Sequence, residues 1–217
     1  AAARDDGDLV HRVALGQQAA DQGVVFTFCC LEVQFRRGNG IGRQQLATRA
    51  RQSLSSGGTD TDSPDVTGKG GAAFLIDYGF PRHEFYHHER TGGTLMCHYR
   101  HRAHPDPYYW PGLQDITAHV DFTAIAEAGF DAGLEVTGYC TQAGWLMDAG
   151  LLDLLAAQQP ADYTQADARW VRTQHAVQTL LSPAEMGEFF KVILLTRGLP
   201  ADLRIPGFVR SDRSHTL

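Results

Sequence analysis

The sequence has no long hydrophobic run, no cluster of basic residues and no signal-like start. No segment approaches the roughly 18 consecutive apolar residues of a membrane-spanning helix. The 19 lysines and arginines are outnumbered by 25 aspartates and glutamates, for a net charge of −6. This balance argues against a protein that wraps nucleic acid or binds membranes through basic patches. The opening residues lack the basic and apolar regions of a secretory signal.

Cysteine is also scarce. The four cysteines are Cys29, Cys30, Cys97 and Cys140, and none belongs to a C-x-x-C pair. A disulfide framework or a cysteine-rich zinc site is therefore not expected, and a reducing, cytoplasmic setting is the default. Histidine, by contrast, is abundant: seven of the ten histidines lie between His83 and His119.

The chain of 217 residues is long enough for one globular domain with a buried core. Its character changes near residue 66, so we expect an atypical, partly disordered segment over 1–66 and an ordered region over 67–217. In the first segment, Val24–Phe35 predicts a strand or hairpin arm and 43–54 a helix. Residues 55–64 have the composition of a linker.

Apolar runs at 72–76, 134–140 and 189–195 predict three strands. The first run does not alternate with polar residues, as expected for a strand covered on both faces. Residues 80–118 are rich in His, Pro, Gly and aromatic residues, and they predict a long irregular insertion that is ordered as a lid. Strands that alternate with helices predict the α/β class.

Three helices are expected after residue 120. Asp121 is a plausible N-cap and Gly133 a stop signal for the first. One further helix is predicted over Trp145–Leu155 and another over Trp170–Leu181. The segment Ser182–Glu185 has the pattern of a capping box and predicts one short helical turn.

The histidines and the glycines each allow a functional and a structural interpretation. His98, His101 and His104 recur at intervals of three and could bind metal, but prolines and glycines interrupt the segment; we therefore predict polar surface histidines and no resident metal. The glycines Gly38, Gly40 and Gly42 fit a nucleotide loop only weakly, because no acidic second strand follows.

Several acidic residues lie at predicted element ends. Asp77 ends a buried strand, at the sheet edge where α/β proteins bind ligands, so it is either functional or a turn cap. Asp115 and Asp121 are either pocket carboxylates or N-caps, and for Asp121 the N-cap is favoured.

An ordered set of motifs resembles a known family. The set comprises GGAAFLIDYG at 70–79, GTL at 93–95, His101, DP at 106–107, DITAHVDF at 115–122 and EMGEFFKV at 185–192. In this order they resemble the carboxyl-terminal half of the MidA-like family of class I S-adenosylmethionine-dependent methyltransferases. A mitochondrial member of that family is an arginine methyltransferase that assists assembly of respiratory complex I.

The resemblance implies a partial Rossmann-like sheet formed by the last three strands of the methyltransferase fold. Residues 71–77, 134–141 and 189–196 would be strands five, six and seven, in the order 5-7-6 with the seventh antiparallel. It further implies S-adenosylmethionine as cofactor and a protein substrate. The insertion would hold His101 and Asp115 near the methyl acceptor, with Asp77 and Asp121 as further catalytic candidates. A eukaryotic member would be mitochondrial.

Residues 1–66 do not resemble the family, and strands two to four do not fit between Gly42 and Gly71. We therefore expect a truncated or rearranged member with low or no activity alone. An exposed edge on strand five would invite pairing, so we expect Val24–Phe35 to cover it or the chain to dimerise through it.

Three functions remain open at this stage: a methyltransferase acting on a protein arginine or another nitrogen, a non-catalytic remnant that binds a partner protein, and a metal-dependent hydrolase built on His83–His104.

Overall fold

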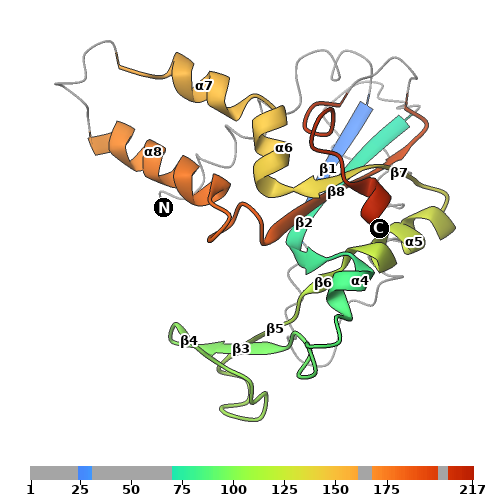
Figure 1. The fold of residues 1–217 in the computed structure, drawn as a ribbon, viewed down its shortest axis with the longest axis vertical. Helices are drawn as coiled ribbons and strands as arrows, with labels where there is room; N and C mark the ends of the chain where they lie inside the picture. The colour runs from blue at the N-terminus through green and yellow to red at the C-terminus, as the bar shows by residue number, and fades with distance from the viewer. Residues whose placement is uncertain (1–23, 31–69, 161–167, 200–204) are drawn as a thin grey trace, which may run out of the picture.

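The computed structural model describes residues 24–30, 70–160, 168–199 and 205–217. The main sheet contains β1 (Val24–Cys30), β2 (Gly70–Phe80), β8 (Phe190–Arg197) and β7 (Glu135–Thr141) in that order. The two-residue strand β6 (Val120–Asp121) pairs with the end of β2. The strands and their covering helices are arranged as in an α/β fold, which confirms the predicted class (Figure 1).

Strand β8 lies between β2 and β7 and is antiparallel to both. The outer two are therefore parallel to each other. This is the order and direction implied for strands five, seven and six of the methyltransferase sheet, and it confirms that expectation.

The far edge of β2 is covered as expected. Strand β1 pairs with it in parallel, with Val24 opposite Gly70 and Cys30 opposite Ile76. The rest of the predicted strand, residues 31–35, lies outside the described residues, as do the predicted helix at 43–54 and the linker at 55–64. At the opposite edge, β7 receives the C-terminal segment: the backbone N–H of Arg213 donates to the carbonyl of Tyr139 (2.6 Å).

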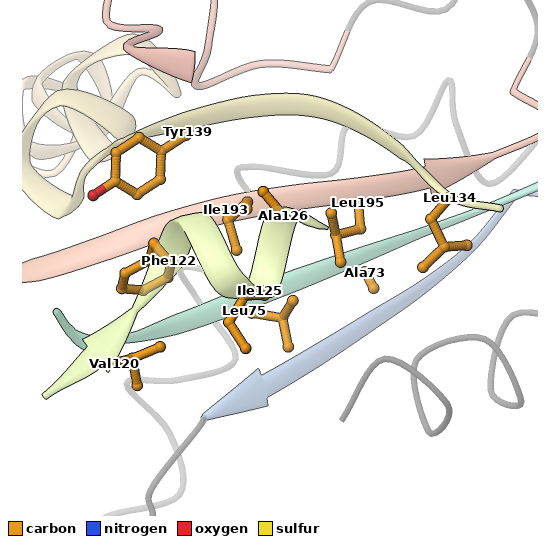
Figure 2. Close-up of a cluster of buried hydrophobic side chains, with 10 residues drawn as sticks. All are labelled: Ala73, Leu75, Val120, Phe122, Ile125, Ala126, Leu134, Tyr139, Ile193 and Leu195. Atoms are coloured by element: carbon orange, nitrogen blue, oxygen red, sulfur yellow. The ribbon is translucent and has the colours of Figure 1, made fainter. Parts of the chain in front are cut away.

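Helix α5 (Phe122–Asp131) covers one face of the sheet. Figure 2 shows its apolar side chains facing those of β2, β8 and β7. Because side chains alternate along a strand, this face receives every second residue. The cluster is Ala73, Leu75, Val120, Phe122, Ile125, Ala126, Leu134, Tyr139, Ile193 and Leu195.

The opposite face is covered by α6 (Gln142–Asp148) and by the end of α8 (Ala168–Leu181). The intervening strand residues point this way and meet Trp145 and Leu146 of α6; Phe74, for example, lies 5.8 Å from Trp145 between ring centroids. Since the central strands are covered on both faces, β8 is buried over six consecutive residues, from Lys191 to Thr196. The unbroken apolar runs in the sequence follow from this double cover.

Two helix predictions were wrong in detail. The single helix expected over Trp145–Leu155 is divided into α6 and α7 (Leu151–Ala157), because Gly150 adopts φ 91° and ends the first helix. The segment Ser182–Glu185 forms a turn and not a helix: the N–H of Gly187 donates to the carbonyl of Ser182 (2.8 Å). None of the helices in the described part of the chain is both long and apolar enough to cross a membrane.

The insertion after β2 is more regular than its composition indicated. It contains the short helix α4 (Arg82–Phe85) and a second sheet of β3 (Met96–Tyr99), β4 (Arg102–His104) and β5 (Asp115–Thr117) in the order β4-β3-β5. This small sheet extends away from the main one (Figure 1), and we call residues 96–117 the arm. The ring of Tyr99 stacks on that of Trp110 at 5.4 Å, while His104 contacts Tyr109 edge-on. Aromatic packing therefore accounts for the order of the arm, as predicted, whereas its role as a lid over the site stays a prediction.

Gly79 provides a test of how closely the start of α5 packs against β2. A Cβ added there would overlap the carbonyl oxygen of Val120 and lie 2.6 Å from the ring of Phe122. Because backbone has little freedom to move aside, we expect Gly79→Ala to lower the free energy of unfolding by about 1–3 kcal/mol. Urea denaturation measures this change. Gly92→Ala is the matched control, since a Cβ at Gly92 meets nothing within 4 Å; equal effects of the two substitutions would contradict the prediction.

Candidate functional site

The carboxyl end of β2 comprises residues 77–80, which we call the β2 rim. Asp77 is buried, with 5% of its surface exposed, and its Oδ1 accepts a hydrogen bond from the N–H of Tyr78 (2.7 Å). Its neighbour in β8 is Lys191, directly opposite in the antiparallel register, so both side chains leave the sheet on the same face. Asp77 thus lies near the carboxyl end of β2, although the strand continues to Phe80, three residues beyond the end that the sequence predicted.

Lys191 is a buried cation at the β2 rim that is not among the site residues predicted from the sequence. Its Nζ donates to the carbonyl oxygen of Glu188 and lies 3.9 Å from that residue's Oε1. Burial lowers the pKa of Lys191, while the negative charges of Glu188 and Glu84 oppose this shift. The sequence did carry a signal: a single lysine interrupts the apolar run at 189–195, where a charge needs a specific reason to be buried.

Asp121 is adjacent to the β2 rim because β6 pairs with the end of β2, placing Phe80 opposite Asp121. Its Oδ1 accepts from the N–H of Ala124 (3.0 Å), which caps α5, and its Oδ2 lies 3.5 Å from Nε of Arg82. Arg82 also binds Glu127 through both terminal nitrogens, at 2.6 and 2.5 Å. The favoured N-cap interpretation is confirmed, whereas a catalytic role for Asp121 stays a prediction.

His119 lies at the base of the arm, immediately before β6. Its ring stacks on Phe80 with 5.0 Å between centroids and meets Tyr78 edge-on at 6.4 Å. Burial lowers the pKa of His119, and the positive charges of Arg90 and Lys191 lower it further. His119 therefore places a neutral imidazole between aromatic rings at the β2 rim. In the sequence, the only signal for this residue was its position in a histidine-rich stretch.

The arm carries the other two predicted site residues. His101 is exposed at the tip of the β3–β4 hairpin, where it and Arg100 adopt positive φ angles of 62° and 47°. Asp115 is exposed at the start of β5 and faces His98 in register. The structure brings Asp77, His119 and Asp121 to the β2 rim, and it places His101 and Asp115 on a separate sheet.

The glycines Gly38, Gly40 and Gly42 lie outside the described residues, so the weak nucleotide-loop prediction is not tested. Within the described ranges, no group of three or more His, Cys, Asp or Glu side chains could hold a metal ion. The thiols of Cys97 and Cys140 are free and buried.

Comparison with known proteins gives this geometry its context. Residues 42–140 match a family model described as "Putative S-adenosyl-L-methionine-dependent methyltransferase". A mitochondrial protein arginine methyltransferase of zebrafish (Danio rerio), NDUFAF7, is 31% identical over 137 residues, which cover 59% of this chain and 28% of that protein.

Two crystal structures from Burkholderia thailandensis are also similar. One is of an uncharacterised protein and the other of a candidate methyltransferase bound to S-adenosylhomocysteine. Both share 57% sequence identity with this chain at a TM-score of 0.61, covering 67% of it and 37% or 36% of their own chains. The chain thus spans about a third of the length of these relatives.

The cap of α5 predicts a stability effect at Asp121. Asp121→Ala removes the acceptor for the Ala124 N–H and the partner of Arg82. We expect the free energy of unfolding to fall by about 1–2 kcal/mol, the usual effect of a lost N-cap. Chemical denaturation measures it, and Asp131→Ala at the exposed end of the same helix is the control. An unchanged unfolding midpoint for Asp121→Ala would show that the cap contributes nothing.

His119 predicts a pH dependence of stability. Its pKa is lower in the folded protein than the value of about 6.5 in the unfolded chain. The unfolded state therefore takes up the proton first, and stability falls as the pH drops below about 6.5. We expect His119→Gln, which cannot titrate, to flatten this slope between about pH 7 and pH 5. Denaturation at a series of pH values tests it; parallel slopes for both proteins would contradict the assignment.

Proposed function

We propose that this chain, which belongs to the MidA-like family of class I S-adenosylmethionine-dependent methyltransferases, forms the acceptor side of a site that methylates a nitrogen of a protein, foremost an arginine. The observation that carries the proposal is the reversed strand β8 between β2 and β7, with a buried carboxylate at the β2 rim. The arginine acceptor is supported by the similarity to the zebrafish relative, which is a protein arginine methyltransferase.

Methyl transfer to an arginine nitrogen requires a proton acceptor near that nitrogen, and the carboxylate of Asp77 can serve as one. A guanidinium has a pKa above 12 and is a poor nucleophile while it keeps its proton. S-adenosylmethionine, when bound, supplies an electrophilic methyl group. The Oδ atoms of Asp77 would hydrogen-bond the acceptor nitrogen, orient its lone pair and accept the proton that it releases.

The remaining predicted residues have weaker support at this site. Both Oδ atoms of Asp121 are occupied by the helix cap and by Arg82. His101 and Asp115 belong to the arm, and their proposed role is to contact the acceptor protein away from the reacting nitrogen. The β2 rim contains no glycine loop that could bind the cofactor, so we assign cofactor binding to none of the described residues. We therefore expect this chain alone to transfer methyl groups slowly.

One observation favours a second candidate, a module that binds a protein without catalysis. The arm exposes large aromatic and aliphatic side chains, with Tyr108 at 85%, Leu113 at 64% and Tyr109 at 53%. Such a surface suits a protein partner. The same surface is also compatible with a methyltransferase that grips its substrate protein, so it does not displace the first proposal. No observation favours the metal-dependent hydrolase, because the histidines from His83 to His104 belong to no group of side chains in the described part of the chain that could hold a metal ion.

A binding and a transfer measurement test the first proposal together. We expect S-adenosylhomocysteine to give weak but saturable heat in calorimetry, and labelled S-adenosylmethionine to methylate an arginine peptide slowly. Asp77→Asn keeps the shape of the side chain but cannot accept a proton. It should lower the transfer rate by about 100-fold and leave the heat unchanged, as expected for a lost general base.

The control is Asp131→Asn, on the exposed end of α5. No heat at high ligand concentration would favour the binding module. Heat together with an undiminished rate for Asp77→Asn would retain the methyltransferase and remove Asp77 from its mechanism.

A further inference from the structure

Three cationic or protonatable side chains converge on one aromatic ring at the β2 rim. The guanidinium of Arg90 lies 4.2 Å from the centroid of Phe80, the ring of His119 stacks at 5.0 Å, and Nζ of Lys191 lies at 5.8 Å. They come from distant parts of the sequence: the segment after α4, the residue before β6 and the start of β8. We call this group the Phe80 cluster.

The carboxylates around the Phe80 cluster lie on the side of Lys191. Glu188 is beside it, with 3.9 Å between Nζ and Oε1, and Asp77 lies opposite it in the sheet. Arg90 keeps a buried Nη1 for which no hydrogen-bond partner exists among the described residues. The rings of Tyr78 and Phe190, packed at 4.0 Å on the same rim, are neutral and cannot compensate. Burial lowers the pKa of His119 most, and the positive charges of Arg90 and Lys191 lower it further.

A group that would satisfy this arrangement is an oxyanion. Guanidinium nitrogens bind carboxylates through charge-assisted hydrogen bonds, which are strongest where the site is partly dry. The ring of Phe80 supplies an apolar wall that excludes water on one side. Phe80, Arg90 and His119 all remain partly exposed, so a ligand can reach them from solvent.

We propose that the Phe80 cluster binds an acidic side chain of the acceptor protein, close to the residue that is methylated. The proposal rests on the proposed function, because it takes the acceptor to be a protein lying over the β2 rim. It deepens that function by naming a sequence preference: an aspartate or glutamate beside the target residue. Arg90 supplies hydrogen bonds and charge, and His119 and Lys191 extend the positive surface.

Burial and, after it, the positive charges of Arg90 and Lys191 lower the pKa of His119. A bound anion offsets the effect of these charges, so we expect it to raise the pKa of His119. This linkage gives a readout that needs no methyl transfer. NMR titration of the His119 ring would be carried out on the whole chain with three probes. These are an arginine peptide flanked by glutamates, the same peptide with glutamines, and inorganic phosphate.

We expect the glutamate peptide to raise the pKa of His119 and to bind about tenfold tighter than the glutamine peptide, as for one hydrogen-bonded ion pair. Arg90→Gln should abolish this preference and Arg90→Lys should restore part of it. Arg172→Gln, at an exposed arginine of α8, is the matched control and should keep the preference. Amide spectra establish that each variant is folded.

Equal affinities for the two peptides, with no change in the pKa of His119, would overturn the proposal. A response to phosphate but not to the glutamate peptide would also overturn it, because the cluster would then be a site for free anions. A chain that prefers the glutamate peptide but transfers no methyl group would uphold the anion site and count against the proposed catalysis alone. Methylation of both peptides at equal rates would refute only the anion site.

Discussion

The antiparallel placement of β8 between two parallel strands is the constraint on which the rest of the structure depends. A strand in this position is hydrogen-bonded on both sides and covered by helices on both faces, so almost none of its surface is exposed to solvent. Its residues from Lys191 to Thr196 are accordingly all buried. The direction of β8 also decides which strand ends lie together: the carboxyl end of β2 meets the amino end of β8, and Asp77 comes to lie opposite Lys191.

That juxtaposition gives the β2 rim its chemistry. A buried carboxylate and a buried ammonium leave the same face of the sheet, and neither would be stable in an apolar core without polar partners. Asp77 receives the N–H of Tyr78, and Lys191 reaches the carbonyl of Glu188. The polar pair is thus confined to the end of the sheet, where the next residue of β2 and the turn before β8 supply its hydrogen-bond partners.

Most of the main sheet could be predicted from the sequence, because double cover leaves a plain pattern of unbroken apolar runs. The N-cap at Asp121 was equally accessible, since the N–H that donates to it, that of Ala124, lies three residues along the chain. The arm could not be anticipated in the same way. Its strands are three or four residues long, and their order comes from stacked rings such as Tyr99 and Trp110 that are eleven residues apart.

The Phe80 cluster escaped prediction for a related reason. Arg90, His119 and Lys191 belong to separate segments. The pairing of β2 with β6 and β8 brings His119 and Lys191 to the ring of Phe80, and Arg90 reaches it from the segment after α4. Local patterns report what a residue does within its own element, and they report nothing about side chains that meet across the sheet. Lys191, a single lysine in an apolar run, was a local signal in the sequence. Such a signal marks a position but does not identify the residues that contact it.

The pairing of Phe80 with Asp121 has an evolutionary consequence. The chain leaves the main sheet at one of these residues and re-enters at the other, so the excursion between them begins and ends at neighbouring points. A loop whose ends are already held together can lengthen or shorten at small entropic cost. The length of the excursion can therefore change at little cost in stability, while the layers beneath it keep their register.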